Sequence, residues 1–347
     1  MPGLPLYSSP GMATRAAIVA RAGRLIGRPQ TTVESFLAQW LKLCHARGLR
    51  PATVASYRVM IRLHVVPTLG AMSLDRVGPS ELNELYQRLL SFGRKDGSGG
   101  LSPRTVRYVH TIIRRAFADA VRLGDARVNP AALADPPSAR AARAPVLPVW
   151  SPDELAQFLR AAEDDRFYPA FYLAATSGMR RGELLGLRWC DVDLDKRELR
   201  IVQTLIEVDH VPRLSPPKTE RSRRTIALDE KTASILLRHR TACDATSKVR
   251  LMNEDLVFLA PNGDLIRPGC FSMAFKRRVE LAGVPHLRLH GLRHTHATMA
   301  LRAGVHPKIV SERLGHASVG ITLDTYSHYV PSLQREAAEA IAALLPD

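Results

Sequence analysis

Hydrophobic residues in the first third of the chain recur with the spacing of amphipathic helices. Apolar runs from Val33 to Cys44, Val54 to Val65, Leu82 to Leu89 and Val106 to Val121 follow the 3.6-residue period. Prolines at 51, 79 and 103 suit first helical turns, and glycines at 48, 70 and 124 suit helix ends. The pattern predicts a helical bundle over residues 31–134.

The pattern then changes twice. Residues 135–150 are rich in Pro, Ala and Arg and have no periodic apolar face, which predicts a linker. Ser151 and Glu154 have capping-box spacing and open a second domain, residues 151–347. Its helical pattern gives way between Glu198 and Leu228 to alternating, β-branched stretches. These predict a small antiparallel sheet with Pro216-Pro217-Lys218 in its turn region, and therefore a mainly α, α+β fold.

Two further local patterns lie after the predicted sheet. Asn262-Gly263 predicts a β-hairpin turn between otherwise helical segments. Near the C-terminus, apolar positions share one face of a predicted small helix: Leu333, Ala337, Ile341 and Leu344. Such a helix cannot bury itself, so it either caps its own domain or docks on a neighbouring protomer.

Charge narrows the choice of partner. The chain has 49 Lys and Arg against 33 Asp and Glu, a formal net charge of +16. Such an excess indicates a polyanion, most often nucleic acid, although a solvated basic surface is the simpler alternative. Residues 1–30 contain arginine and no acid, and we expect a flexible basic tail. No apolar run reaches the ~18–20 residues of a membrane span, and the scattered four cysteines fit a reducing cytosol.

Candidate chemistry concentrates near the end of the chain. His290 and Arg293 are three residues apart in a helical pattern, so both can reach one ligand. His316 and Tyr326 follow within forty residues. A guanidinium donates paired hydrogen bonds to a phosphate, and a phenol with a pKa of ~10 can attack phosphorus when it is assisted.

Three sequence stretches carry a family resemblance. "TSGMRRGELLGLRW" (176–189), "PPKTERSRRTI" (216–226) and residues 289–328 together closely resemble the catalytic domain of the tyrosine recombinases, the phage-integrase family. The resemblance extends over roughly residues 32–338. It implies a catalytic set of six residues: Arg180, Lys218, His290, Arg293, His316 and Tyr326. In this family the tyrosine forms a 3′-phosphotyrosine with DNA and frees a 5′-hydroxyl, so strands rejoin without ATP.

The resemblance also assigns roles within this set. It favours Arg180 over its neighbour Arg181, and Tyr326 over Tyr329. Two arginines would stabilise charge on the non-bridging oxygens, and Lys218 would protonate the departing oxygen. The two histidines at 290 and 316 would contact the phosphate or shuttle the phenolic proton.

Two neighbours of the set would support it. Glu183 would brace Arg180, and His294 would pack behind the site. The i, i+4 spacing of His290 and His294 is also that of metal ligands. However, no Glu follows the first histidine and no Cys or Asp lies nearby, so we expect neither a metal nor another cofactor.

The family has a helical, SAM-like core-site-binding domain where the first bundle lies. Its arginines are therefore expected to contact DNA: Arg58, Arg62, Arg104, Arg107 and Arg114. By themselves they would equally suit an ordinary solvated bundle. Two of them, Arg104 and Arg107, follow a helix N-terminus, where phosphate binds readily.

The expected function is site-specific cutting and rejoining of double-stranded DNA by a homo-tetramer, integrating or excising a phage or mobile element. A directionality factor or DNA-bending protein would assist it, in the cytoplasm and on the nucleoid. Three alternatives stay open: an Xer-like resolvase, a type IB topoisomerase, and a regulator that binds DNA without cutting it. Assembly on paired sites separates a recombinase from a topoisomerase, and the complete catalytic set argues against the regulator.

Overall fold

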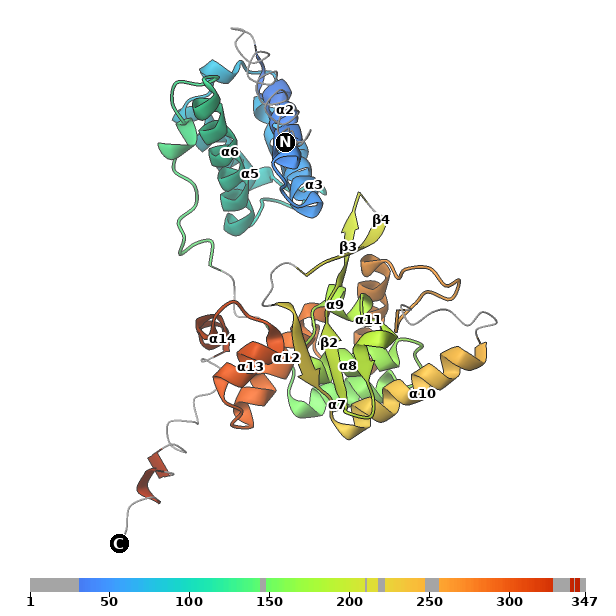
Figure 1. Ribbon diagram of the computed structural model, residues 1–347. Coiled ribbons are helices and arrows are strands. Elements are labelled where there is room, and N and C mark those ends of the chain that lie inside the picture. Colours follow the sequence, from blue (N-terminus) through green and yellow to red (C-terminus); the bar gives the residue numbers. More distant parts are fainter. Residues whose placement is uncertain are drawn as a thin grey trace, which may run out of the picture. The chain divides into compact units, whose positions relative to one another are not determined.

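The chain folds into helices with two small antiparallel sheets, as Figure 1 shows. The computed structural model describes residues 31–143, 148–209, 211–217, 222–246, 256–326, 338–339 and 341–343. It divides into two compact units, Met1–Pro145 and Val146–Asp347. The mainly helical α+β class predicted from the sequence is confirmed. The predicted basic tail lies outside the described residues.

The first unit is built from helices alone, apart from an isolated bridge. They are α2 (Val33–Ala46), α3 (Pro51–Met60), η1 (Ile61–Val65), α4 (Val66–Leu69), η2 (Leu74–Arg76), α5 (Pro79–Phe92), α6 (Pro103–Leu123) and η3 (Pro130–Ala132). Thr32 and Ser102 cap α2 and α6 by accepting a backbone N–H, and Gly124 ends α6 with φ 84°. The large apolar side chains of the predicted faces, Trp40 and Tyr86 among them, form one core.

A π-turn joins α3 to α4. Residues Ile61–Val65 are π-helical, and the Val66 N–H donates to the Ile61 carbonyl five residues earlier. Pro67 follows at once and has no N–H to donate to a regular helical turn. The helix predicted to close at Pro67 and Gly70 therefore continues to Leu69 through this wider turn.

The second unit combines helices with two sheets. Its elements are α7 (Pro152–Ala161), α8 (Tyr168–Ser177), α9 (Arg181–Leu185), η4 (Trp189–Asp191), β1 (Val192–Asp193), β2 (Glu198–Ile201), β3 (Thr204–Val208), β4 (Val211–Ser215), β5 (Arg224–Ala227), α10 (Glu230–Thr246), α11 (Pro268–Ala282), α12 (Leu289–Arg302), α13 (Pro307–Leu314) and α14 (Val319–Tyr326). One sheet has the order β1-β2-β5, with Leu199 opposite Ile226. β3 and β4 form a separate hairpin, in which β3 contacts α9 and α11 and the far end projects from the helices of this unit (Figure 1).

An aromatic cluster forms the centre of this unit. Phe158, Phe171, Phe271 and Phe275 come from α7, α8 and α11 and are almost completely buried, with ring centroids 5.0–5.7 Å apart. Leu292 adds the apolar face of α12 to the same core. α8 and α12 pack against each other, so the end of α8 is brought beside α12 and α13.

Two local predictions have different outcomes. The hairpin predicted at Asn262-Gly263 is wrong, because residues 256–267 form no strand pair with one another. The chain only turns here: the Ala260 N–H donates to the Asp264 carbonyl and the Gly263 N–H to the Ala260 carbonyl. Asn262 bonds Asp264 instead of starting a strand pair. The predicted C-terminal helix falls almost entirely outside the described residues. Among those described, no helix is long and apolar enough to cross a bilayer.

Candidate active site

Arg180 lies at the junction between two helices. α8 ends at Ser177, Gly178 follows with a left-handed backbone (φ 66°), and Arg180 is the extended residue before α9. Glu183, in the first turn of α9, accepts hydrogen bonds from the Arg180 backbone N–H (2.9 Å) and from its Nη1 (2.7 Å). The carboxylate thus fixes both the backbone and the guanidinium of Arg180.

A second guanidinium, that of Arg224 in β5, binds the same carboxylate. Its Nη1 lies 3.2 Å from Glu183 Oε1, and its Nη2 lies 2.8 Å from Oε2. The exposed fractions are 7% for the Arg224 side chain and 4% for that of Glu183, so solvent screens the pair little. Burial alone would raise the pKa of the Glu183 carboxyl, but the hydrogen bonds and charge of Arg224, with the charge of Arg180, hold this pKa below its ordinary value.

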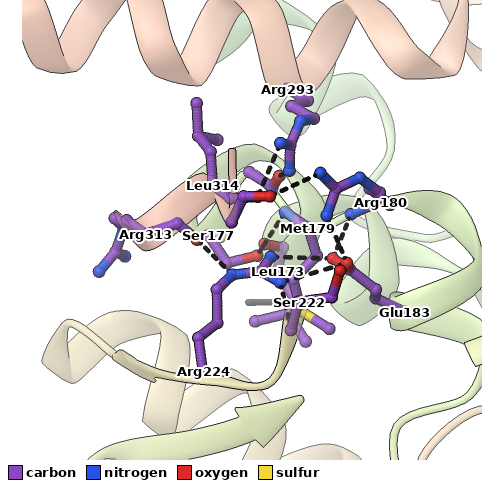
Figure 2. Close-up of polar contacts among 12 residues, drawn as sticks. Leu173, Ser177, Met179, Arg180, Glu183, Ser222, Arg224, Arg293, Arg313 and Leu314 are labelled. Carbon is purple, nitrogen blue, oxygen red and sulfur yellow. Dashed lines mark hydrogen bonds and ion pairs between the residues drawn. The ribbon is translucent and has the colours of Figure 1, made fainter. Parts of the chain in front are cut away.

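Arg293, in α12, joins the end of α8 to the end of α13. It is 3% exposed. Its Nη1 donates to the Gly178 carbonyl (2.8 Å) and its Nη2 to the Leu314 carbonyl (2.7 Å). Arg180 Nη2 donates to the next carbonyl, that of Gly315 (2.9 Å). Figure 2 shows both guanidinium groups gathered at this turn.

The end of α13 offers three consecutive carbonyl groups, and each accepts from a different arginine. The Arg313 carbonyl accepts from Arg224 Nε at 2.6 Å, next to the two bonds already described at Leu314 and Gly315. Carbonyls at a helix C-terminus lack intrahelical partners, and the negative end of the helix dipole favours cations. Gly315 has φ 65°, and a Cβ there would lie 3.0 Å from Arg224 Nη1. Glycine therefore permits both the turn and the close approach.

His316 follows directly after this turn. Its backbone N–H donates to the Ser311 carbonyl, and its Nδ1 lies 2.8 Å from Thr322 Oγ1 in α14. Burial, followed by the nearby charges of Arg293 and Arg180, lowers the pKa of His316 to about 4. The imidazole is therefore neutral at pH 7 and is a weaker base than a free histidine.

α12 carries the other two predicted histidines. His290 is exposed and stands three residues before Arg293, while His294 is buried, with the two imidazole centroids 4.8 Å apart and perpendicular. Burial, then the charges on His290 and Arg293, lowers the pKa of His294 to about 4. In the part of the chain that is described, no group of three or more His, Cys, Asp or Glu could hold a metal ion.

Two predicted catalytic groups have no described side chain. Lys218 lies in residues 218–221, outside the described residues, between β4 and β5. Tyr326 is the last residue of α14, but its side chain lies outside the description, as does all of Tyr329. The structure therefore brings together Arg180, Glu183, Arg293, His294 and His316, with His290 one helical turn before Arg293.

The arginines predicted to contact DNA lie in the other unit, on α3, η1 and α6. Arg58, Arg62, Arg104 and Arg114 are exposed. Arg107 is half-buried, and its Nη1 donates to the Pro137 carbonyl at 2.7 Å. Arg107 thus holds the chain that follows η3 against α6.

Sequence reasoning missed two arginines of the site. Arg224 stands inside the quoted stretch "PPKTERSRRTI", but its partner Glu183 is 41 residues away. Arg313 links the Ala227 and Thr176 carbonyls and donates from Nε to His296 Nε2. The Nδ1 of His296 lies 3.1 Å from the Ala175 carbonyl, so Nδ1 carries the proton. The sequence offered one signal for Arg224: it is an arginine at the start of a predicted half-buried strand, where a charged side chain needs a partner.

Both units match one protein family. Residues 149–332 match the phage integrase family, and residues 32–90 match the phage integrase N-terminal SAM-like domain. A "tyrosine recombinase XerC-like" protein of Caldanaerobacter subterraneus is 26% identical, covering 92% of this chain and 85% of that protein. The putative prophage phiRv2 integrase of Mycobacterium tuberculosis is 28% identical, covering 91% and 80% respectively.

Solved structures show the same fold. The Tn1549 transposon integrase in complex with a circular intermediate DNA has a TM-score of 0.72 at 23% identity, covering 89% of this chain and 99% of that one. A lambda integrase tetramer bound to a Holliday junction has a TM-score of 0.64 at 17% identity, covering 95% and 90%. The family match covers more than half of the chain and includes the buried arginine site. The chain therefore belongs to the phage integrase family of tyrosine recombinases, enzymes of site-specific recombination that break and rejoin DNA.

Proposed function

We propose that this recombinase integrates or excises a phage or mobile element by forming a 3′-phosphotyrosine through Tyr326. The observation that carries the proposal is the placement of Arg180 and Arg293, whose guanidinium groups bind adjacent carbonyls beside His316. Two cations fixed side by side suit the two non-bridging oxygens of one phosphodiester. Because the carbonyls hold the guanidinium groups before DNA arrives, little reorganisation is needed at the transition state.

The remaining roles follow from proton balance. Tyr326 loses its phenolic proton as its oxygen attacks phosphorus, and the 5′ oxygen must gain a proton as it leaves. His316 is neutral at pH 7, since its pKa is lowered to about 4, and so weak a base would hold the phenolic proton only transiently and relay it toward solvent. His290 contacts the phosphate, and Lys218 protonates the leaving 5′ oxygen. Rejoining runs the same steps in reverse, which conserves the bond energy and requires no ATP.

The partner in this proposal is double-stranded DNA, held by both units. The net charge of +16 and the exposed arginines of α3, η1 and α6 support backbone contacts. A homo-tetramer on two paired core sites would exchange the strands, on the nucleoid, aided by a directionality or DNA-bending protein. The tetramer of the structurally similar lambda integrase on a Holliday junction supports this assembly.

A suicide substrate nicked near the cleavage site tests the nucleophile. Wild type should accumulate a denaturant-resistant protein–DNA adduct, in EDTA and without ATP, because the arginines supply the charge stabilisation. Tyr326→Phe should bind the substrate with unchanged affinity and form no adduct, because only the hydroxyl is removed. Tyr329→Phe is the matched control and should form the adduct. An adduct from Tyr326→Phe but not from Tyr329→Phe would reverse the assignment.

A further inference from the structure

A single buried side chain connects the strand, helix and turn that carry the site. Arg224 begins β5, and its guanidinium binds Glu183 of α9 on one side and the Arg313 carbonyl of α13 on the other. Its Nη1 also donates to the Ser222 carbonyl at 3.1 Å. Figure 2 shows Arg224 reaching from its strand toward Glu183, across from Arg180. Each of the three guanidinium nitrogens of Arg224 already donates to a protein oxygen, so its donors serve contacts within the protein.

The charges around Glu183 show what this arrangement does. Glu183 carries one negative charge, and without Arg224 its ion-pair partner would be Arg180. A carboxylate paired one-to-one with Arg180 would cancel most of the positive potential that Arg180 offers to a phosphate. Arg224 supplies a second positive charge, so the three groups together retain a net charge of +1. Glu183 can then orient Arg180 without neutralising its effect on a bound anion.

We propose that Arg224 is a positioning residue that balances the charge of Glu183, so that Arg180 is held in place and still acts as a full cation toward the scissile phosphate. This proposal rests on the proposed function. Hydrogen bonds from Arg224 alone would not achieve it, because the positive charge is what offsets the carboxylate. Position 224 therefore requires a cation. Loss of that cation should slow adduct formation only when the substrate phosphate is itself charged.

A pair of substrates separates this role from a structural one. One carries the normal scissile phosphodiester, and the other carries a methylphosphonate, in which a methyl group replaces one non-bridging oxygen and removes the negative charge. The measured quantity is the ratio of the single-turnover adduct rates, phosphodiester over methylphosphonate. Arg224→Gln keeps hydrogen-bond donors but loses the charge, and it should lower this ratio about 10²-fold, the scale of one lost charge-stabilising donor.

Three companion variants complete the test. Arg224→Lys keeps the charge and should keep the ratio near the wild-type value, even if both rates fall. Arg224→Gln combined with Glu183→Gln removes both charges and should restore most of the ratio. Arg200→Gln, an exposed arginine on the adjacent strand β2, is the matched control and should leave both rates unchanged.

The outcomes are distinct. An unchanged ratio in Arg224→Gln, with both rates equally reduced, would overturn the proposal and leave Arg224 a structural residue. The same conclusion would follow if Arg224→Gln, and its double variant, did not fold at the assay temperature by circular dichroism. Failure of wild type to form an adduct on either substrate would instead reject the proposed function.

Discussion

The carbonyl oxygen of Gly178 accepts a hydrogen bond of 2.8 Å from Arg293, which lies 115 residues later in the chain. Gly178 can present its carbonyl in this way because its φ is 66°, a conformation that residues with a Cβ rarely adopt. A Cβ at this position would lie 2.6 Å from Leu314 Cδ2 and 2.7 Å from His296 Cδ2. Both neighbours pack against the same turn, so neither can move independently of the site.

Gly178→Ala should therefore lower both stability and activity. We expect a loss of ~2–4 kcal/mol in the free energy of unfolding, from left-handed strain together with overpacking. Adduct formation should slow as well, because Arg293 loses its fixed acceptor. Gly283→Ala is the matched control: Gly283 ends α11 with the same φ of 66°, but a Cβ added there would meet no atom within 4 Å. In urea denaturation Gly283→Ala should lose less free energy of unfolding than Gly178→Ala, and it should still cleave DNA. Equal losses in the two variants would contradict the argument that a Cβ at position 178 is overpacked.

Glu183→Gln should be far more costly than the same change at another helix start. The amide would leave the buried guanidinium of Arg224 and the partly exposed one of Arg180 facing a neutral partner, at a cost of ~3–5 kcal/mol that arises mainly at Arg224. Glu154→Gln is the control, because Glu154 has the same capping position in α7 but bonds only the Ser151 N–H there. Glutamine serves in a capping box, so this control should lose less than ~1 kcal/mol. The prediction fails if denaturation gives similar losses for the two variants.

The half-buried imidazole of His296 should make stability depend on pH. Burial, followed by the charge of Arg313, lowers the pKa of His296 from 6.5 to about 4. The unfolded chain then binds a proton that the folded chain does not bind, so the stability is complete above pH ~6.5 and falls as pH drops toward ~4. Over this interval His296 accounts for ~3 kcal/mol. His296→Gln should flatten the dependence in urea titrations at several pH values, and an unaltered slope would contradict the assignment.

The role of Lys218 can be separated from that of the two arginines. If Lys218 protonates the leaving oxygen, Lys218→Ala should be rescued by a substrate with a 5′-bridging phosphorothiolate, whose sulfur leaves without a proton. General-acid catalysis is worth ~10²–10⁴-fold, so the rescue should be measurable. Arg180→Ala and Arg293→Ala should not be rescued, because their contacts are to non-bridging oxygens. Rescue of all three, or of none, would make Lys218 a backbone contact only.

The arginines of the first unit should differ in what their removal does. Arg104→Ala removes an exposed cation near the start of α6, so affinity for duplex DNA should fall. The slope of log affinity against log salt concentration should become shallower by about one. Arg107→Ala also removes the bond to the Pro137 carbonyl and should additionally lower the thermal stability of the protein. Anisotropy titrations at several salt concentrations, with thermal melts, distinguish the two effects.

The positions of the helices and the family resemblance of the site could be predicted from the sequence, because both depend on local patterns. The period of apolar residues located α2, α5 and α6, and the three-residue spacing put His290 and Arg293 on one helix. The family resemblance of "TSGMRRGELLGLRW" marked Arg180 as the first arginine, and this residue proved to be the extended one that precedes a helix.

The contacts that hold the site could not be predicted in the same way. Arg224 meets Glu183, and Arg293 meets Gly178 and Leu314, only after distant segments have packed together. The acceptors are mostly backbone carbonyls, which every residue carries and which leave no signal in a sequence. The prediction at Asn262-Gly263 was wrong for a related reason: a turn signal does not show whether the flanking residues find strand partners.

The use of main-chain oxygens as acceptors also affects how the site can diverge. The groups that hold Arg180, Arg224 and Arg293 at the end of α13 belong to the peptide backbone, so they survive any substitution that keeps its path. Evolutionary drift in the neighbouring side chains is then compatible with a constant arrangement of cations. Among the residues of these turns, Gly178 and Gly315 should tolerate substitution least, because their backbone conformation is itself required.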